Sequence, residues 1–322
     1  MLVDAHPVAR ITSGRVSATN PDQPPSGAPT LCLGDVVVDL ICERPAGAVS
    51  ECDAFVPHLG GSVATVAVTA ARHGAHVALA GGAGDDDWGR WLRDRVRHEG
   101  VETEWFELLP GAQTAVAIVT VDRDGEPSGQ FYGERIASPL GDRVEEAVRD
   151  SAALFIGSGA LVGAAESEAT MRARALALSL ERPVVFDPSL CVKRWRSRAE
   201  AAAAANACVP EALLVRATER DAELMTGEED PERAALALLK AGARMVVITL
   251  GDSGAILRGE LRLDVDGVAP SVVSRVGAGD ALTGVLLARL AMSAFYPATV
   301  AASLPEAVAE SARACERWGA LD

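Results

Sequence analysis

The stretch SRVGAGDALTGVLLARL, residues 274–290, raises the question on which the interpretation of the whole chain depends. Gly277, Ala278 and Gly279 carry no side chain larger than a methyl group, and they lead directly into Asp280 and an apolar segment of helical character. Two interpretations are open. In the first, glycine supplies the backbone angles of a loop and Asp280 caps a buried helix. In the second, these residues form an anion site with a general base beside it.

The anion-site interpretation is physically coherent. Small residues at 277–279 allow consecutive backbone N–H groups to turn toward one point. The aligned peptide dipoles of the helix that follows place about half a positive charge at its N-terminus. A transferring phosphoryl group would be stabilised there without any lysine, and Asp280 would accept the proton of the attacking hydroxyl. The rest of the sequence has to decide between the two interpretations.

Composition and charge exclude several classes of protein. The chain has 322 residues, is 49% hydrophobic and carries a formal net charge of −15, so it can bury a large core but is a poor ligand for nucleic acid. Asp4, His6 and Arg10 interrupt the positions where a signal peptide would have its apolar core. The longest uncharged stretches contain Gly, Ser, Thr or Pro and do not resemble a membrane-spanning helix. We therefore expect a cytoplasmic protein that binds neither nucleic acid nor a membrane.

Neither the cysteines nor the histidines form a recognisable metal or redox motif. The six cysteines include no C-x-x-C pair, and we interpret them as reduced thiols of a reducing compartment. The five histidines include no H-E-x-x-H, so a metal site built on histidine is not expected.

The chain divides into a tail and one long α/β region. Residues 1–28 are rich in Pro, Ser, Thr and Gly and are predicted to be a flexible tail. In 29–322, short β-branched or apolar runs alternate with helical patterns, which predicts a largely parallel sheet covered on both faces. Segments 42–58 and 101–135 break this alternation. We expect them to form a small second sheet that acts as a lid, with a hairpin turn at Asp124-Gly125.

Two common phosphate-binding motifs are absent. A Walker A loop is excluded because neither Lys193 nor Lys240 follows a glycine. The dinucleotide fingerprint fails because Gly82-Ala83-Gly84 is followed by three aspartates, which would repel a pyrophosphate. The protein-kinase H-R-D loop is also missing. The stretch at 274–290 remains.

Several segments along the chain share the order and spacing of the motifs of one family. They are Gly34 to Asp39 for G-x-x-x-x-D, Gly60 to Thr65 for G-G-x-x-x-N, Gly84 to Gly89 for a glycine–aspartate turn, Thr218 to Asp221 for N-x-x-E, Thr249 to Gly254 for T-L-G-x-x-G, and Gly277 to Asp280 for G-A-G-D. From about residue 30 to residue 320 the chain resembles the ribokinase-like, phosphofructokinase-B type carbohydrate kinases. This resemblance implies a three-layer α/β/α fold with a mostly parallel central sheet and a small β-sheet lid.

The resemblance also implies a role for each matching position. A sugar-like substrate would be bound by Asp39, Gly60, Gly61 and Thr65, and the ATP site would be lined by Thr249, Gly251 and Gly254. Mg²⁺ and its waters would be arranged by Thr218 and Asp221, with Asp221 as the metal-side carboxylate. The anion hole would be formed by Gly277, Ala278 and Gly279, and the general base would be Asp280.

This sequence departs from the family pattern in two regions that concern substrate and metal. Thr65 stands where Asn is usual, which replaces an amide contact by a hydroxyl. Thr218 and Asp221 replace the Asn and Glu of N-x-x-E, and Asp221 is one methylene shorter than Glu. Its reach to a hydrated metal is therefore an open question.

A third departure lies directly before the anion loop. Ser274 and Arg275 replace Asp-Thr in a region where many relatives bind a monovalent cation, so we do not carry that cation site over. Arg275 either places its guanidinium near a phosphate or is a solvated surface residue. Cys191, in DPSLC, stands where relatives often have Arg in D-x-N-x-R.

Three hypotheses about function follow. The first is an ATP-dependent kinase for a hydroxyl of a sugar or a sugar-derived compound. The second is a nucleoside kinase of the same fold, which an aromatic lid wall would favour; Trp105, Phe106, Phe131 and Tyr132 are the candidates for such a wall. The third is a non-catalytic sugar- or nucleotide-binding regulator. We also expect a homodimer formed through the lid, since exposed strand edges invite pairing.

Overall fold

The computed structural model describes residues 24–133, 141 and 143–321. Most of the predicted tail, residues 1–23, lies outside the described residues. Residues 134–135 of the second predicted lid segment lie outside them too. Within the described residues, no helix is long and apolar enough to cross a bilayer, and all six cysteines are free thiols.

The central element is a nine-stranded sheet with the order β13-β12-β11-β10-β9-β8-β1-β4-β5. The strands from β11 to β5 are parallel to their neighbours, and β12 and β13 extend the sheet in antiparallel fashion. The strands are β1 (Thr30–Leu33), β4 (Val77–Gly84), β5 (Phe106–Leu109), β8 (Ala153–Gly157), β9 (Val184–Asp187), β10 (Leu214–Thr218), β11 (Met245–Thr249), β12 (Gly254–Gly259) and β13 (Leu263–Asp266). The predicted, mostly parallel sheet is confirmed.

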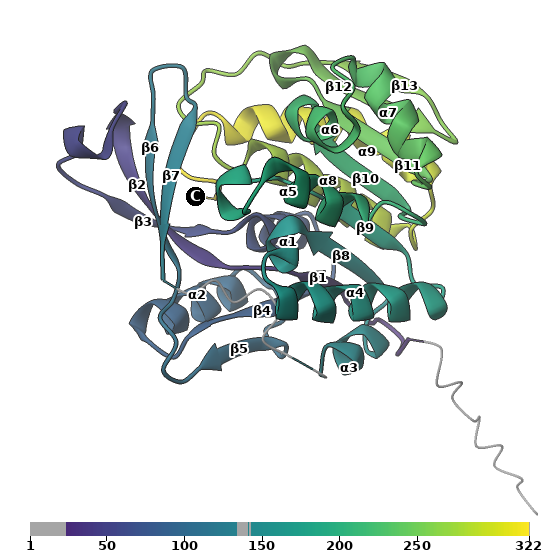
Figure 1. The fold of residues 1–322 in the computed structure, drawn as a ribbon, viewed down its shortest axis with the longest axis horizontal. Helices are drawn as coiled ribbons and strands as arrows, with labels where there is room; N and C mark the ends of the chain where they lie inside the picture. Colours follow the sequence, from purple (N-terminus) through teal and green to yellow (C-terminus); the bar gives the residue numbers. More distant parts are fainter. Residues whose placement is uncertain (1–23, 134–140, 142, 322) are drawn as a thin grey trace, which may run out of the picture.

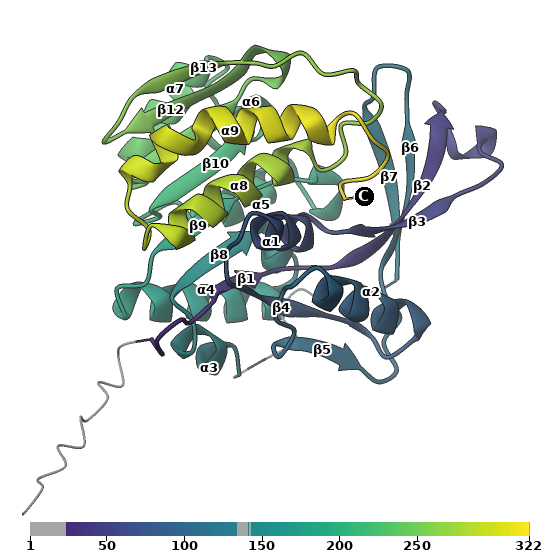
Figure 2. The same cartoon turned by 180° about the vertical axis from the view of Figure 1, so that it is seen from behind.

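Helices cover both faces of this sheet (Figures 1 and 2). One face carries α1 (Ser62–Arg72), α2 (Asp87–His98), α8 (Ala278–Met292) and α9 (Ala298–Ala314); the other carries α3 (Arg143–Arg149), α4 (Ala164–Ser179), α5 (Arg198–Asn206), α6 (Glu219–Thr226) and α7 (Pro231–Lys240). Successive strand residues point to opposite sides, so Leu31 and Leu33 belong to one core and Cys32 to the other. The predicted three-layer arrangement is therefore confirmed.

A separate four-stranded sheet stands beside the central one (Figure 1), with the order β3-β2-β6-β7. Its strands are β2 (Val37–Pro45), β3 (Val56–Gly60), β6 (Val116–Val121) and β7 (Pro127–Tyr132). The β6–β7 hairpin turns at the predicted Asp124-Gly125, where Gly125 has φ 82°. Short 3₁₀ helices complete the chain: η1 (Val49–Glu51), η2 (Ser158–Leu161), η3 (Val192–Arg194) and η4 (Gly251–Ser253).

The small sheet occupies somewhat different segments from the predicted lid ranges 42–58 and 101–135. It begins already at Val37, because the chain leaves the central sheet after β1 and its next apolar residues pair with β3 and β6. Residues 106–109 form β5 and pair with β4 in the central sheet, where Phe106 is buried in the core. The run VVVDLI at 36–41 is as apolar as a central strand, so only the strand pairing assigns it to the small sheet.

Candidate active site

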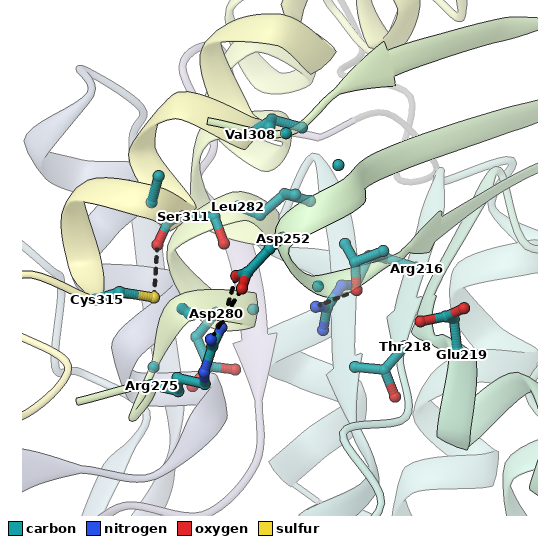
Figure 3. A pocket seen from close by; sticks show the side chains of 18 of the residues that line it. Arg216, Thr218, Glu219, Asp252, Arg275, Asp280, Leu282, Val308, Ser311 and Cys315 are labelled. Carbon is teal, nitrogen blue, oxygen red and sulfur yellow. Dashed lines mark hydrogen bonds and ion pairs between the residues drawn. The ribbon is translucent and has the colours of Figure 1, made fainter. Parts of the chain in front are cut away.

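Two cavities meet at the N-terminus of α8. The larger, about 720 Å³, lies beside the carboxyl ends of β10 and β11 (Figure 3). The smaller, about 190 Å³, lies between the small sheet and the start of α1. Asp280 and Ser189 line both. Clefts at the carboxyl ends of parallel strands are the usual ligand sites of α/β folds.

The predicted site residues gather around these two cavities. The larger is lined by Thr218, Asp221, Thr249, Gly251, Gly254, Gly277, Ala278, Gly279 and Asp280. The smaller is lined by Asp39, Gly61, Thr65 and, again, Asp280. Gly60 lines neither and packs behind Asp39. The residues predicted to bind ATP and those predicted to bind the substrate, Gly60 excepted, thus line two adjoining cavities.

The tip of α8 begins at a position that only glycine fits. Gly277 caps the helix in the left-handed region, with φ 76°, and a Cβ atom there would lie 2.7 Å from the Ala320 Cα. The N–H of Ala278 donates to the Arg275 carbonyl at 3.3 Å. The N–H groups of Gly277 and Gly279 donate to no acceptor in the described part of the chain. These two amides are therefore available to an anion in the larger cavity.

Asp280 is placed in the first turn of α8, where its Oδ1 accepts a 2.5 Å hydrogen bond from the Ser62 Oγ. Burial raises the pKa of Asp280 to about 7, with a further contribution from the Asp187 carboxylate; the bond from Ser62 acts in the opposite direction. Ser62 is the first residue of α1. At neutral pH the Asp280 carboxyl is therefore near its midpoint, which suits a group that accepts a proton during turnover.

Asp39 faces the smaller cavity from β2. Burial raises its pKa to about 7, and repulsion from Asp280 and Asp35 adds to the shift. A Cβ atom on Gly60 would lie 2.5 Å from the Asp39 Oδ1, and one on Gly61, whose φ is 94°, would lie 2.5 Å from the Asp35 carbonyl oxygen. The double glycine is thus required by the close approach of residues 35–39.

The aromatic residues do not form a wall around the smaller cavity. Trp105 and Phe106 are buried in the two hydrophobic cores, and Tyr132 is 54% exposed. Phe131 alone of the four candidates lines the cavity. A single ring does not make an aromatic wall, so these residues do not favour a nucleoside base over a sugar.

Asp221 and Thr218 form a capping box at the start of α6. The Asp221 Oδ2 accepts hydrogen bonds from the Thr218 N–H at 3.3 Å and from its hydroxyl at 2.7 Å, while Oδ1 accepts one from the Leu190 N–H at 3.1 Å. Burial raises the pKa of Asp221. The carboxylate therefore organises the helix and the Leu190 loop, and its Oδ1 retains spare acceptor capacity.

The turn after β11 contributes Thr249, Gly251 and Gly254 to the larger cavity. Gly251 and Gly254 have φ of 56° and 104°, so this turn depends on both glycines. Asp252, between them, accepts two hydrogen bonds from Arg275, at 2.9 and 3.1 Å (Figure 3).

The sequence left open whether Arg275 lies near a phosphate or is a solvated surface residue. Its Nε also lies 3.3 Å from Glu126, in the turn of the β6–β7 hairpin. Its guanidinium is therefore ion-paired on two sides, and it ties the turn after β11 to the small sheet.

Sequence reasoning missed four residues that line or support the two cavities: Asp35, Ser62, Asp187 and Arg216. Asp187 is fully buried and accepts from Arg216 at 3.2 Å and from the Thr283 hydroxyl at 2.6 Å. One signal was available for Arg216. A charged residue inside the buried strand LLVRAT needs a buried partner or a ligand.

Comparison with known proteins agrees with this geometry. The model of the pfkB family of carbohydrate kinases matches residues 30–320. The chain is 32% identical to fructokinase-1 of Oryza sativa subsp. japonica over 266 residues, which is 80% of this chain and 81% of that protein. A double mutant of fructokinase from Vibrio cholerae O395, solved with fructose, ADP and a potassium ion, superposes with a TM-score of 0.81 at 28% identity, over 91% of this chain and 94% of that one.

A more distant structure, a ribokinase II from E. coli solved with ATP and Mg²⁺, has a TM-score of 0.79 at 20% identity and supports the fold alone. The family match, together with the fold and the two adjoining cavities, places the chain among the phosphotransferases of the ribokinase-like class. The chain belongs to the pfkB family of carbohydrate kinases.

Proposed function

We propose that this protein transfers the γ-phosphoryl group of ATP to a hydroxyl of a ketohexose such as fructose, with Asp280 as the general base. The observation that carries the proposal is the position of Asp280, which lines both cavities at the tip of α8. The similarity to plant fructokinases and to a bacterial fructokinase with bound fructose supports the choice of sugar.

The two cavities give the reaction its geometry. The sugar would occupy the smaller cavity between Asp39 and Asp280, and ATP would occupy the larger one with its phosphates at the helix tip. Asp280 takes the proton of the attacking hydroxyl as the new O–P bond forms and the bond to ADP breaks. The free amides of Gly277 and Gly279 stabilise the negative charge on the transferring group.

The small sheet would act as a lid over the sugar. It supplies Asp39 from β2 and Phe131 from β7 to the smaller cavity. A sheet that contributes both a polar contact and an apolar cover excludes water from the phosphoryl group and prevents futile hydrolysis of ATP.

Mg²⁺ would neutralise charge on the ATP phosphates when it is bound. In the described part of the chain, no cluster of three or more metal-binding side chains forms a ready cage. Asp221 and the exposed Glu219 and Glu223 line the larger cavity, and these oxygen ligands fit an ion that keeps most of its waters and is shared with phosphates. Of these, Asp221 would hold the hydrated ion, with the charges of Glu219 and Glu223 beside it.

A coupled assay for ADP release tests the proposed function. With ATP and Mg²⁺ we expect turnover with fructose that exceeds turnover with glucose or with any nucleoside. Turnover with a nucleoside and none with a hexose would replace the proposal by the nucleoside kinase. Thermal stabilisation by a non-hydrolysable ATP analogue without turnover on any acceptor would favour the regulator.

The pH dependence of kcat/KM provides a prediction about Asp280. Its carboxyl must be ionised to act as a base, so activity should rise with pH through about 7. Asp39 titrates in the same range, and the observed limb belongs to the pair. The bond from Ser62 lowers the Asp280 pKa, so Ser62→Ala should move the limb upward by about one pH unit, the size expected for a hydrogen bond to a charged group.

The test compares kcat/KM of the wild type and of Ser62→Ala from pH 5 to pH 9, with a control variant. Ser179→Ala, at the end of α4, removes a hydroxyl bonded to the Leu176 carbonyl and should leave the profile unchanged. An unshifted limb in Ser62→Ala would show that the Ser62 bond does not set the titration.

The small sheet also carries our proposal of a homodimer. Its edge strand β7 exposes most of its residues, including Tyr132, which is 54% exposed. At the other edge, Val56 of β3 is 39% exposed. We expect sedimentation equilibrium to give a dimer, and Tyr132→Arg to weaken it. Tyr296→Arg, at a residue 65% exposed after α8, serves as the control. A monomer at every concentration would contradict pairing through β7.

A further inference from the structure

We propose that Arg216 is a further catalytic residue, whose guanidinium contacts the transferring phosphoryl group at the tip of α8. The inference deepens the proposed function and rests on it. It gives the phosphoryl group a full positive charge in addition to the helix-tip amides.

The position of Arg216 in the sheet directs its side chain toward α8. It is the third residue of β10 and is only 2% exposed. Its neighbours Val215 and Ala217 point into the core on the opposite face, while Leu214 belongs to the core under α8. Strand alternation therefore turns Arg216 to the side of α8.

The guanidinium lies directly against the anion loop. A Cβ atom on Gly279 would lie 2.7 Å from the Arg216 Nη1 and 2.9 Å from its Cζ. A side chain at Gly279 would therefore have to displace the guanidinium. Arg216 lines the larger cavity together with Gly277 and Gly279, and Figure 3 shows it reaching that cavity from β10 while Asp280 reaches it from α8.

The hydrogen bonds of Arg216 leave donors unused. Nη1 donates to Asp187 at 3.2 and 3.4 Å, and Nη2 donates to the Thr249 hydroxyl at 3.1 Å. Its buried Nε has no acceptor among the described residues. A guanidinium carries five N–H donors, and a buried cation with unmet donors is costly unless a ligand supplies acceptors. Phosphate oxygens match that fork.

Asp187, the ion-pair partner of Arg216, also accepts hydrogen bonds from other residues. Asp187 accepts bonds from the Thr283 hydroxyl at 2.6 Å and from the Ser189 hydroxyl at 2.9 Å, besides those from Arg216. It orients the guanidinium, and its charge is shared among several donors.

The other cations around the cavity are placed differently. Arg275 is tied to Asp252 and Glu126, and Arg220 is exposed on α6. The same cavity is lined by several carboxylates, Asp221, Glu219 and Glu223 among them. Against this negative background Arg216 is the cation that lies at the helix tip, where charge develops during transfer.

Arg216→Lys tests the role while keeping a charge opposite Asp187. We expect kcat to fall by about 10²-fold, in the range observed when a transition-state hydrogen-bond donor is removed. KM for the sugar should stay within about threefold. If Arg216 had only a structural role, its substitution would change the affinities for ADP and for a non-hydrolysable ATP analogue equally. Both affinities are therefore measured by calorimetry. The variant should bind ADP normally and lose affinity for the analogue.

Arg258→Lys is the matched control, because Arg258 is also a buried, ion-paired arginine of the same sheet, 4% exposed, and lies outside the cavity. It should leave kcat unchanged. Should Arg216→Lys not fold, the double variant Arg216→Gln with Asp187→Asn, which removes both buried charges together, is compared with Asp187→Asn alone.

A kcat within threefold of wild type, or an equal loss of affinity for ADP and for the analogue, would overturn the proposal. The binding comparison does not depend on the acceptor. It therefore distinguishes failure of the Arg216 role from failure of the sugar assignment.

Discussion

Asp280→Asn is expected to lower kcat by about 10²- to 10⁴-fold, the range for a positioned general base, and to leave the affinity for ATP unchanged. Asn has nearly the shape of Asp and its side-chain oxygen can accept the bond from Ser62, so the start of α8 should be preserved. Its amide cannot take the proton of the acceptor hydroxyl. The measurement is kcat at saturating sugar and ATP, together with the calorimetric affinity for a non-hydrolysable ATP analogue.

The same variant should be more stable than wild type in alkaline solution. Because the Asp280 pKa is raised from 3.8 to about 7, ionising it costs folding free energy at pH values above 7, and that cost disappears as the pH falls toward 4. Thermal unfolding should therefore show a higher midpoint for Asp280→Asn at pH 8 and a smaller difference at pH 5. Near-normal turnover would remove Asp280 from the role of general base, and a destabilised variant at pH 8 would contradict the raised pKa.

Asp39→Asn is expected to lower kcat/KM for the sugar by about 10- to 100-fold, the effect of losing a hydrogen bond to a charged acceptor. A carboxylate can accept bonds from two neighbouring hydroxyls, whereas an amide offers one acceptor and one donor group. Asp39 lies in the smaller cavity, so KM for ATP should not change. Initial rates over both substrates separate these effects.

Asp53→Asn is the control for that measurement, since Asp53 is an exposed residue after η1 that pairs with Arg44 outside both cavities. It should behave as wild type. If Asp39→Asn altered KM for ATP and KM for the sugar equally, the division into a sugar cavity and a nucleotide cavity would be wrong.

The central fold was predictable because its signals are local. Runs such as VVF at 184–186 and MVVIT at 245–249 alternate with helical patterns, and parallel strands buried on both faces have this composition. The boundary of the small sheet was not predictable in the same way. The run VVVDLI at 36–41 is as apolar as a central strand, and its membership is decided by pairing with β3 and β6.

The candidate site was predictable where glycine and aspartate carry the chemistry. Gly277 has no room for a side chain, Gly279 packs against the Arg216 guanidinium, and a run of small residues before an aspartate is visible in a sequence. The partners of the site were not visible. Ser62 bonds Asp280 across 218 positions, and Arg216 meets Asp187 across 29. These contacts arise from tertiary packing of separate strands and helices.

The altered N-x-x-E element keeps a structural role. Asp221 closes a capping box with Thr218 and accepts a hydrogen bond from the Leu190 N–H, so the pair stabilises the start of α6. The negative charge is retained beside the larger cavity.

The central claim is that the tip of α8 holds the transferring phosphoryl group while Asp280 deprotonates the acceptor. A crystal structure with fructose, ADP, Mg²⁺ and aluminium fluoride tests it most directly. We predict fluoride atoms within hydrogen-bond distance of the Gly277 and Gly279 N–H groups, and a fructose hydroxyl about 3 Å from the Asp280 carboxylate, in line with the metal fluoride. A fluoride group bound away from these amides, or a hydroxyl directed away from Asp280, would contradict it.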